Sequence, residues 1–341
     1  MSRVMVAMSG GVDSSVTAAL VQQQGHEVVG VTLKLWGGES DQGCCSVADV
    51  DDARRVADQL GIDHHVFNFG DEFSEHVVDP YVADHAAGRT PNPCIECNRH
   101  LKFDRLLRRA DALGFDAVAT GHHARVVDHD GVLRVGRGTD PTKDQSYVVH
   151  MLRPDQLARV RFPVGDRTKS DVRELAETLG LRTASKPDSQ DVCFITAGQG
   201  RQNFLADRLD LHHGDVIDEA GAVVGHTDAV ELVTLGQRRG LGLGGGGVPR
   251  YVTEVDVPRR RVQVGRRHDL LVDSVSVGDL IWLAGRVDGP LSVQSSAHGQ
   301  ARVASVDGTV VRFAEPVPRV ASGQSVVVYA GDLVVAGGIA D

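Results

Sequence analysis

Apolar runs alternate with segments of helical periodicity over the first 200 residues of the chain. The runs are short and continuous, which is typical of strands buried on both faces of a sheet. Between them, apolar residues recur every three or four positions, and a glycine follows several of these segments. This alternation predicts an α/β fold with a parallel sheet and helices on both of its faces. We expect strands at 3–8, 27–33, 65–69 and 116–120 and helices at 15–24, 50–60, 106–113 and 168–179.

The pattern changes after about residue 200. From residue 214 onward, short runs with a period of two are separated by Gly and Asp, and from residue 274 the period-two pattern is continuous. Asp307-Gly308 marks a tight hairpin turn between two such runs. We therefore expect three domains: an α/β domain over 1–200, a small β-rich domain over 201–266, and a C-terminal β-barrel over 267–341.

Composition narrows the class of protein. With 41% hydrophobic and 24% charged residues among 341, the chain is composed like a folded soluble protein. It has no apolar run of the roughly 18 residues that cross a membrane, and no apolar core of a secretory signal near its start. Five cysteines are too few for a disulfide scaffold and fit a reducing compartment. We therefore expect a cytoplasmic protein without a membrane partner.

The distribution of charge is compatible with a nucleic-acid partner. A net charge of −10 excludes a uniformly basic nucleic-acid binder. Arginines nevertheless cluster at 237–240 and 258–268. A local basic face of this kind could hold phosphates, although charge alone fits solvated surface arginines equally well.

The sequence SGGVDS at 9–14 follows the first expected strand and opens the first expected helix. Glycines let the backbone approach an anion, and the start of a helix offers free N–H groups. The segment lacks the Gly-Lys-Ser/Thr of a Walker loop and the glycine spacing of a dinucleotide fold. A cradle without lysine but with Asp13 suits pyrophosphate held as a leaving group, with Mg²⁺ nearby. The alternative is a plain Gly-Gly turn with a serine cap.

Three cysteines form the second candidate site. Cys94 and Cys97 have the spacing C-x-x-C, and Cys193 lies far along the chain. Pro91 and Pro93 precede the pair, so we expect the approach to Cys94 to be extended rather than helical. The spacing leaves several interpretations open: inert buried thiols, a zinc site, an iron–sulfur cluster on the three thiols, or a nucleophile with a sulfur-carrying partner.

The segment at 9–14 resembles the phosphate loop of the PP-loop ATP pyrophosphatases, which cleave ATP between the α and β phosphates and adenylate an oxygen atom. With the motifs that follow, essentially the whole chain resembles the bacterial and organellar tRNA-specific 2-thiouridylases. The motifs are TPNPCIECNRHLKF at 90–103, ATGHHAR at 119–125, KDQSYV at 143–148, KPDSQDVCFI at 186–195 and GQRRGLG at 236–242. The resemblance implies a PP-loop catalytic domain that uses ATP and Mg²⁺, and a C-terminal barrel that contacts tRNA.

The resemblance also implies a reaction. The family converts the wobble uridine of Lys, Glu and Gln tRNAs to 2-thiouridine, releasing AMP and pyrophosphate. Cys193 then takes persulfide sulfur from a relay protein or a cysteine desulfurase, and Cys97 is the nucleophile that completes the transfer. The nucleotide residues it implies are Ala7, Met8, Ser9, Gly10, Gly11, Val12, Asp13, Ser14, Leu33 and Gly121. We expect a monomer, and the rival interpretations are another adenylating ligase or a nucleotide-regulated RNA-binding module.

Contacts with tRNA are implied at two places. Asn92, Pro93 and Cys94 would meet the target base, and the remaining contacts would be His122, Lys143, Asp144, Gln145 and Gln324, with 237–239 as further candidates. The chain departs from the family at Cys94, where many members carry an aspartate proposed for acid–base work. It also has Ser296-Ala297-His298 where members often have an arginine in an RNA-contacting strand. The role of Cys94 is therefore open.

Overall fold

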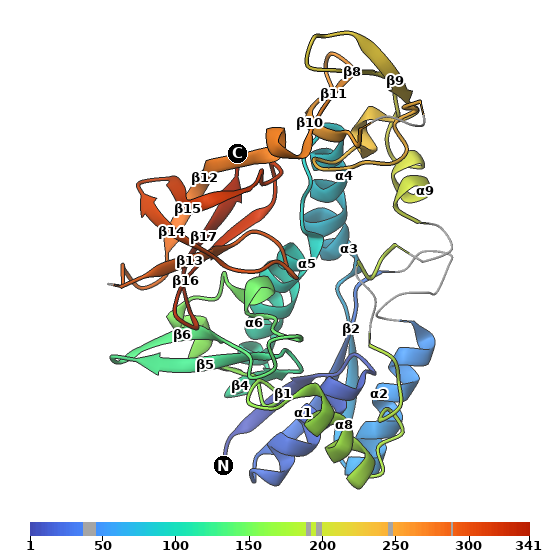
Figure 1. Cartoon of the computed structure of the whole chain (residues 1–341). Helices are drawn as coiled ribbons and strands as arrows, with labels where there is room; N and C mark the ends of the chain where they lie inside the picture. The colour runs from blue at the N-terminus through green and yellow to red at the C-terminus, as the bar shows by residue number, and fades with distance from the viewer. Residues whose placement is uncertain (37–45, 189–191, 196–199, 245–247, 288) are drawn as a thin grey trace.

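The computed structural model describes the chain except for residues 37–45, 189–191, 196–199, 245–247 and 288. Cys44 and Cys45 lie outside the described residues. Over the described ranges, Figure 1 shows an α/β unit, a small β-rich unit and a barrel. This architecture confirms the expected fold class.

A five-stranded parallel sheet forms the centre of the α/β unit. Met5 pairs with Val29 on one side and with Val118 on the other, and every neighbouring pair of strands is parallel. The spatial order of the strands is β3 (Asp63–Asn68), β2 (Glu27–Lys34), β1 (Arg3–Ala7), β4 (Ala117–Thr120) and β7 (Val160–Arg161). The strand order changes direction between β1 and β4, and ligands of open α/β sheets usually bind at the carboxyl ends of the strands at such a point.

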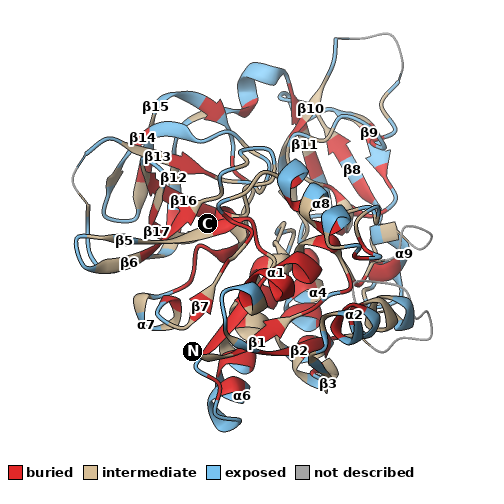
Figure 2. Cartoon of the chain, turned by 90° about the horizontal axis from the view of Figure 1, so that it is seen from below, coloured by how far each residue is buried: buried red, intermediate tan, exposed pale blue. Residues whose placement is uncertain are grey.

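Helices α1 (Val12–Gln23), α2 (Val47–Leu60) and α8 (Lys169–Thr178) pack together beside the sheet and bury one apolar cluster. Figure 2 shows that most of α1 is buried. This helix begins three residues before the predicted position. The pattern missed its first turn because that turn carries serines, whose hydroxyls donate to the Gly11 carbonyl inside the helix.

A second cluster of buried side chains packs against the helical run that contains the thiols. This run consists of α5 (Pro93–Glu96), the π-helical η2 (Cys97–Arg105) and α6 (Leu106–Ala112). The shorter helices are α3 (Gly70–Phe73), η1 (Ser74–Val78), α4 (Asp79–Ala86), η3 (Ser146–Val149), α7 (Pro154–Leu157), α9 (Gly200–Ala206), η4 (Val230–Leu232) and η5 (Arg267–Leu270). Among the described residues, none of the helices combines the length and apolarity that crossing a bilayer requires.

The prediction of an extended approach to Cys94 is wrong from Pro93 onward. Helix α5 begins at Pro93, and the Asn92 side chain caps it by accepting a 3.1 Å hydrogen bond from the Cys94 N–H. Proline is well suited to the first helical position, because its missing N–H would have had no partner there. Cys94 and Cys97 therefore lie one helical turn apart on a continuous run.

The β-rich unit holds a four-stranded sheet in the order β10 (Tyr251–Asp256), β11 (Arg261–Gly265), β8 (Gly214–Ile217) and β9 (Val223–Thr227). Strands β8 and β11 are parallel, and the outer pairs are antiparallel. Its core is a small aliphatic cluster around Val216 and Val262.

The C-terminal strands close into a barrel, because β12 pairs with both β15 and β17. Its strands in spatial order are β12 (Leu271–Trp282), β15 (Val310–Pro318), β14 (Arg302–Asp307), β13 (Leu291–Gln294), β16 (Ser325–Ala330) and β17 (Leu333–Ala340). The predicted hairpin at Asp307-Gly308 is confirmed. A further hairpin, β5 (Ala124–His129) and β6 (Val132–Arg137), extends this sheet from the α/β unit. The sequence pattern did not predict that hairpin.

Candidate active site

The segment between β1 and α1 follows the carboxyl end of β1, which is paired with the carboxyl end of β4. Gly10 has φ +72°, and a Cβ there would come within 2.9 Å of the Asp49 Cα, so only glycine fits. A Cβ on Gly121, just after β4, would lie 2.8 Å from the Ser14 nitrogen. The backbone of Gly121 therefore lies directly against the backbone of the predicted cradle at Asp13 and Ser14.

Hydroxyl groups fix the shape of this cradle. Ser14 Oγ accepts a 3.1 Å hydrogen bond from the Ser9 N–H and donates to the Gly11 carbonyl at 3.1 Å. Gly11 caps α1 without a side-chain hydrogen bond. The first N–H groups of α1 are thus available to an anion such as the phosphates of ATP, and the residues present fit that group.

Asp13, in the first turn of α1, is paired with a lysine from α8. Both Asp13 carboxylate oxygens accept hydrogen bonds from Lys169 Nζ, at 2.8 and 2.7 Å, and His123 Nε2 lies 3.2 Å from Oδ1. Burial raises the pKa of Asp13, but the bonds to His123 and Lys169 outweigh burial and leave this pKa below its usual value. Mg²⁺ bound at Asp13 would share this carboxylate with Lys169 and His123.

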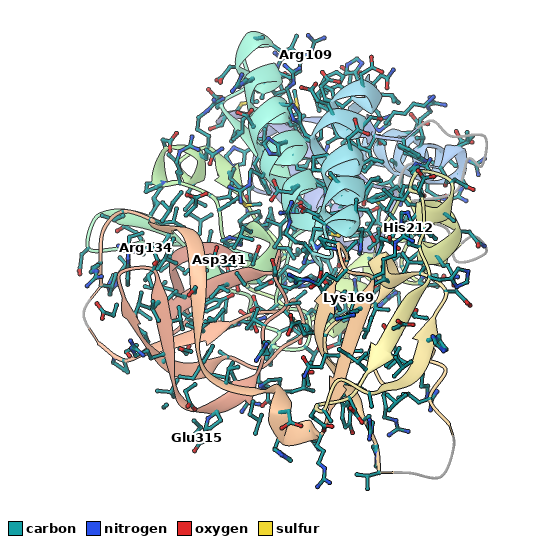
Figure 3. The ribbon with its side chains drawn as sticks, turned by 90° about the horizontal axis from the view of Figure 1, so that it is seen from above. Arg109, Arg134, Lys169, His212, Glu315 and Asp341 are labelled. Carbon is teal, nitrogen blue, oxygen red and sulfur yellow. The ribbon has the colours of Figure 1, made fainter. Side chains whose placement is uncertain are left out.

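Lys169 is a site residue that the sequence did not reveal. Its side chain is 11% exposed, and in Figure 3 it lies toward the middle of the molecule. The predicted cradle lacks a lysine in sequence, yet the fold supplies one from the first residue of α8. Thr168 caps α8, because its hydroxyl accepts a hydrogen bond from the Asp171 N–H. This cap fixes the start of the helix and so the position of Lys169, its first residue. No local signal could have found it, because its partner is 156 residues away.

Asp188 extends the charge network to a predicted tRNA residue. Its carboxylate pairs with Lys143 at 2.8 Å, Lys169 at 2.9 Å and Arg173 at 2.8 Å. Partial burial raises the pKa of Asp188, but hydrogen bonds from Lys143 and Lys169 overcome this and hold it well below the usual range. Lys143 therefore belongs to the same network as Asp13.

The loop that carries Lys143 is held by its next two residues. Gln145 exchanges two 2.9 Å hydrogen bonds with the His123 backbone, one through its side chain and one through its own N–H. Asp144 accepts from Arg137 at 2.7 Å and from the Ser146 N–H at 3.0 Å, and its side chain is only 7% exposed. Asp144 therefore bonds to groups inside the protein, whereas Gln145 links the loop to His123, which contacts Asp13.

His122 faces the interior rather than an open surface. Its Nδ1 lies 2.7 Å from the Thr120 hydroxyl, and its ring packs against Phe103 and Phe162. Burial lowers the pKa of His122 well below its usual value, so the imidazole is neutral at neutral pH.

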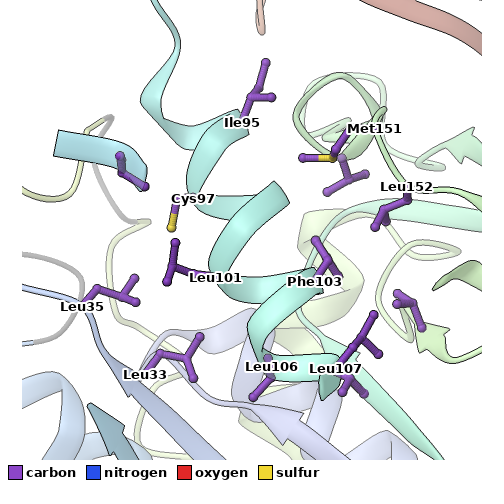
Figure 4. Close-up of a cluster of buried hydrophobic side chains, with 14 of the residues drawn as sticks. Leu33, Leu35, Ile95, Cys97, Leu101, Phe103, Leu106, Leu107, Met151 and Leu152 are labelled. Atoms are coloured by element: carbon purple, nitrogen blue, oxygen red, sulfur yellow. The ribbon is translucent and has the colours of Figure 1, made fainter. Parts of the chain in front are cut away.

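Two of the three thiols adjoin one apolar cluster. Cys97 is 5% exposed within this cluster, which also contains Leu33 and Leu101 (Figure 4). Cys193 is partly buried and packs against the same cluster. Its neighbour Phe194 is held among aromatic rings, 5.5 Å from Phe73, 5.5 Å from Tyr81 and 5.2 Å from Phe204. Residues far apart in sequence, Cys97 and Cys193, are therefore brought to one cluster that also holds the predicted nucleotide residue Leu33.

Gln324 of the barrel lies beside the approach to the C-x-x-C pair. Its side-chain amide donates to the Thr90 carbonyl, and the Thr90 N–H donates to the Ser322 carbonyl at 2.8 Å. Cys94, at the start of α5, is half-buried. In the described part of the chain, no three His, Cys, Asp or Glu side chains are grouped so as to hold a metal ion.

Three family models match the chain in order. They are the tRNA methyl transferase HUP domain over 2–197, the tRNA methyl transferase PRC-barrel domain over 202–266 and the aminomethyltransferase beta-barrel domain over 290–340. A relative from Geobacter metallireducens, named tRNA-specific 2-thiouridylase MnmA, is 44% identical, with 99% of this chain and 96% of that protein covered. A relative of the same name from Corynebacterium kroppenstedtii is 48% identical, with 98% and 94% covered.

A solved 4-thiouridine synthetase–RNA complex with bound ATP has a weaker likeness. It is 17% identical with a TM-score of 0.40, and the match covers 57% of this chain and 45% of that one.

Proposed function

This chain belongs to the tRNA-specific 2-thiouridylase family, and we propose that it thiolates C2 of the wobble uridine in Lys, Glu and Gln tRNAs, using ATP with Mg²⁺. It is a sulfurtransferase that acts on tRNA uridine. One observation supports the finer proposal: Leu33, which the resemblance implies as a nucleotide residue, and Cys97, expected to act on sulfur, belong to one buried cluster (Figure 4). Activation by ATP and sulfur transfer can therefore take place on one extruded base.

The first step is adenylation of the uridine. The uracil O2 forms a bond to the α-phosphorus of ATP, pyrophosphate leaves with the electron pair of the broken P–O bond, and the N3 proton is lost to solvent. The N–H groups at the start of α1 bind the phosphates, and Lys169 offsets the negative charge of Asp13 beside them. The base must leave the anticodon stack to react, which is usual for enzymes that modify bases.

The second step transfers sulfur. A relay protein or a cysteine desulfurase loads Cys193 as a persulfide, whose terminal sulfur attacks C2 and expels AMP. The Cys97 thiolate then attacks the Cys193 sulfur, which releases 2-thiouridine and leaves a Cys97–Cys193 disulfide. In the alternative order, Cys97 first frees sulfide from the persulfide, and the sulfide attacks C2. A thiol reductant resets the pair in both orders.

The test is nucleoside mass spectrometry on unmodified Glu tRNA. Anaerobic, metal-free protein is incubated with ATP, Mg²⁺, a thiol reductant and a persulfide donor, a cysteine desulfurase with L-cysteine, beside the variants Cys94→Ala, Cys97→Ala and Cys193→Ala. We expect 2-thiouridine at the wobble position with wild type, and its loss in Cys97→Ala and Cys193→Ala. Cys44→Ala serves as the matched control and should keep full activity.

Other outcomes would redirect the proposal. Full activity of Cys97→Ala would contradict the thiol mechanism and favour another adenylating ligase. Activity that appears only after iron and sulfide are reconstituted would replace the persulfide by an iron–sulfur cluster. The Cys94→Ala variant shows whether the Cys94 thiol, which stands where many family members have an aspartate, takes part in the reaction.

A further inference from the structure

The barrel contacts the thiol-bearing helical run through a short loop before β16. Both backbone groups of Thr90 bond to this loop: its N–H donates to the Ser322 carbonyl at 2.8 Å, and its carbonyl accepts from the Gln324 amide. Between these two residues, Gly323 has φ +87° and packs closely, because a Cβ there would lie 3.1 Å from the Arg89 Cβ. Figure 1 shows the barrel beside α5.

The loop is itself fixed to the barrel. The Gly323 N–H donates to the Ala340 carbonyl at 3.0 Å, and the Ala340 N–H donates back to the Gln324 carbonyl at 2.8 Å. Ala340 ends β17, which closes the barrel against β12. The position of Thr90 is thereby tied to the rigid barrel.

The backbone from Thr90 to Cys94 and Cys97 has few freely rotating torsion angles. Pro91 and Pro93 have fixed φ angles, and between them the Asn92 side chain is held by the 3.1 Å bond from the Cys94 N–H. Helix α5 begins at Pro93 and runs directly into η2, which starts with Cys97. A displacement of Thr90 is therefore passed to Cys94 and Cys97 rather than absorbed on the way.

From these contacts we infer that Gln324, with the loop 322–324, is a positioning residue for the thiol-bearing segment. It holds Cys94 and Cys97 in place before any tRNA arrives, by bonding to the Thr90 carbonyl. The inference goes beyond a tRNA contact at Gln324, and its link to catalysis rests on the proposed roles of the thiols. It makes the barrel part of the active-site scaffold.

The test measures thiol reactivity in the full chain without tRNA. The wild type and the variants Gln324→Ala and Gly323→Ala are treated with iodoacetamide, and peptide mass spectrometry gives the alkylation rate of each cysteine. Losing one of the bonds to Thr90 should raise the rates at Cys94 and Cys97 about fivefold, since reaction of a buried thiol requires local opening. The rate at Cys193, on another segment, should stay within about twofold of wild type.

Tyr147→Phe is the matched control. It removes the 2.9 Å hydrogen bond that the Tyr147 hydroxyl donates to the carbonyl of the barrel residue Ser325, next to Gln324, without touching Thr90. Rates at Cys94 and Cys97 that rise equally in this variant would overturn the inference, as would wild-type rates in both loop variants. If Gln324→Ala fails to fold, Gln324→Glu keeps the shape of the side chain and replaces the donor by a charged acceptor that cannot bond to the Thr90 carbonyl.

A second readout separates positioning from tRNA binding. With saturating tRNA, we expect Gln324→Ala to lower kcat for thiolation about fivefold or more, whereas a contact made only to tRNA would raise KM and leave the free-protein alkylation rates unchanged. Failure of the proposed function would look different. The wild type would then make no 2-thiouridine, while the alkylation rates would still report on the bond to Thr90.

Discussion

At the scale of single residues, the candidate site depends on close approach and on one buried ion pair. The sequence predicted the cradle at 9–14 because glycines and serines before a helix are a local signal. It could not predict Lys169, whose partner Asp13 becomes its neighbour only when α8 packs against α1. Long-range ion pairs leave no local pattern in a single sequence.

Gly10→Ala tests the close approach. The new Cβ would overlap the Asp49 carbonyl and would also be strained at φ +72°. We expect ATP affinity, measured by calorimetry, to fall about tenfold or more, because the cradle must move away from α2. Gly25→Ala is the control, since Gly25 has φ +82° but open space around it. It should cost about 1 kcal/mol of stability and leave ATP affinity unchanged, and equal effects on ATP in both variants would contradict the argument.

Lys169→Met tests the ion pair. Asp13 and Asp188 both have lowered pKa values, so their pairs stabilise the fold above the ordinary carboxyl pKa near 4 and are lost as pH falls through the lowered values. We expect the variant to lose roughly 1–2 kcal/mol at pH 7, a value discounted for the 29% exposure of Asp13. The difference from wild type should shrink below about pH 4. Urea unfolding between pH 3 and pH 7 measures it, and a constant difference would refute the assignment.

At the scale of elements, the sequence predicted the parallel sheet well and misjudged the segments where chemistry is placed. The strands at 27–33 and 116–120 were found within one residue of each end, because continuous apolar runs are a strong signal. The helical start at Pro93 was not predicted, because proline disfavours helix interiors yet is well suited to the first helical position. The hairpin β5–β6 was missed although Asp130-Gly131 is a local turn signal between its strands. Only its pairing with β17, about 200 residues further along the chain, leaves no local pattern.

Thr168→Ala tests whether helix capping positions the cradle lysine. The Thr168 hydroxyl accepts from the Asp171 N–H at 3.2 Å, and Lys169 is the next residue. Losing this cap should cost about 1 kcal/mol and also weaken ATP binding, because the start of α8 frays. Asp269→Ala is the control, because it removes the capping bond of η5, a 2.6 Å bond from the Arg266 N–H to the Asp269 carboxylate, outside the α/β unit. Both variants should melt at similar temperatures in calorimetry, but only Thr168→Ala should bind ATP less tightly.

At the scale of the whole molecule, the α/β unit and the barrel share buried polar contacts that the sequence did not signal. Arg137 bonds to Asp144 at 2.7 Å and to Gln294 of the barrel at 3.0 Å, and its guanidinium lies 3.8 Å from the centre of the Tyr329 ring. Ser146 lies 3.1 Å from the Tyr329 hydroxyl. The loop that reaches toward Asp13 is therefore supported by the barrel.

His150 makes this junction sensitive to acid. It is buried against Gly337 of β17, where a Cβ would come within 2.9 Å of its Nε2, and its Nδ1 lies 2.8 Å from the Tyr147 carbonyl. Burial lowers the pKa of His150 to about 4, from about 6.5 in an unfolded chain. The unfolded chain therefore binds the extra proton first, and stability falls as pH drops from about 6.5 to 4.

The variant His150→Asn should lower the slope of the unfolding free energy against pH by the contribution of one proton. His85, whose pKa burial also lowers to about 4, and the neutral His122 keep the rest, so the slope should decrease without vanishing. The measurement is the free energy of unfolding by urea at several pH values between 4 and 7. His226→Asn is the control, because His226 is an exposed residue of β9, and a decrease in slope as large as that of His150→Asn would contradict the role of burial. A slope unchanged in His150→Asn would mean that His150 binds its proton at the same pH in the folded and unfolded states, and that water reaches the junction more readily than the close packing against Gly337 implies.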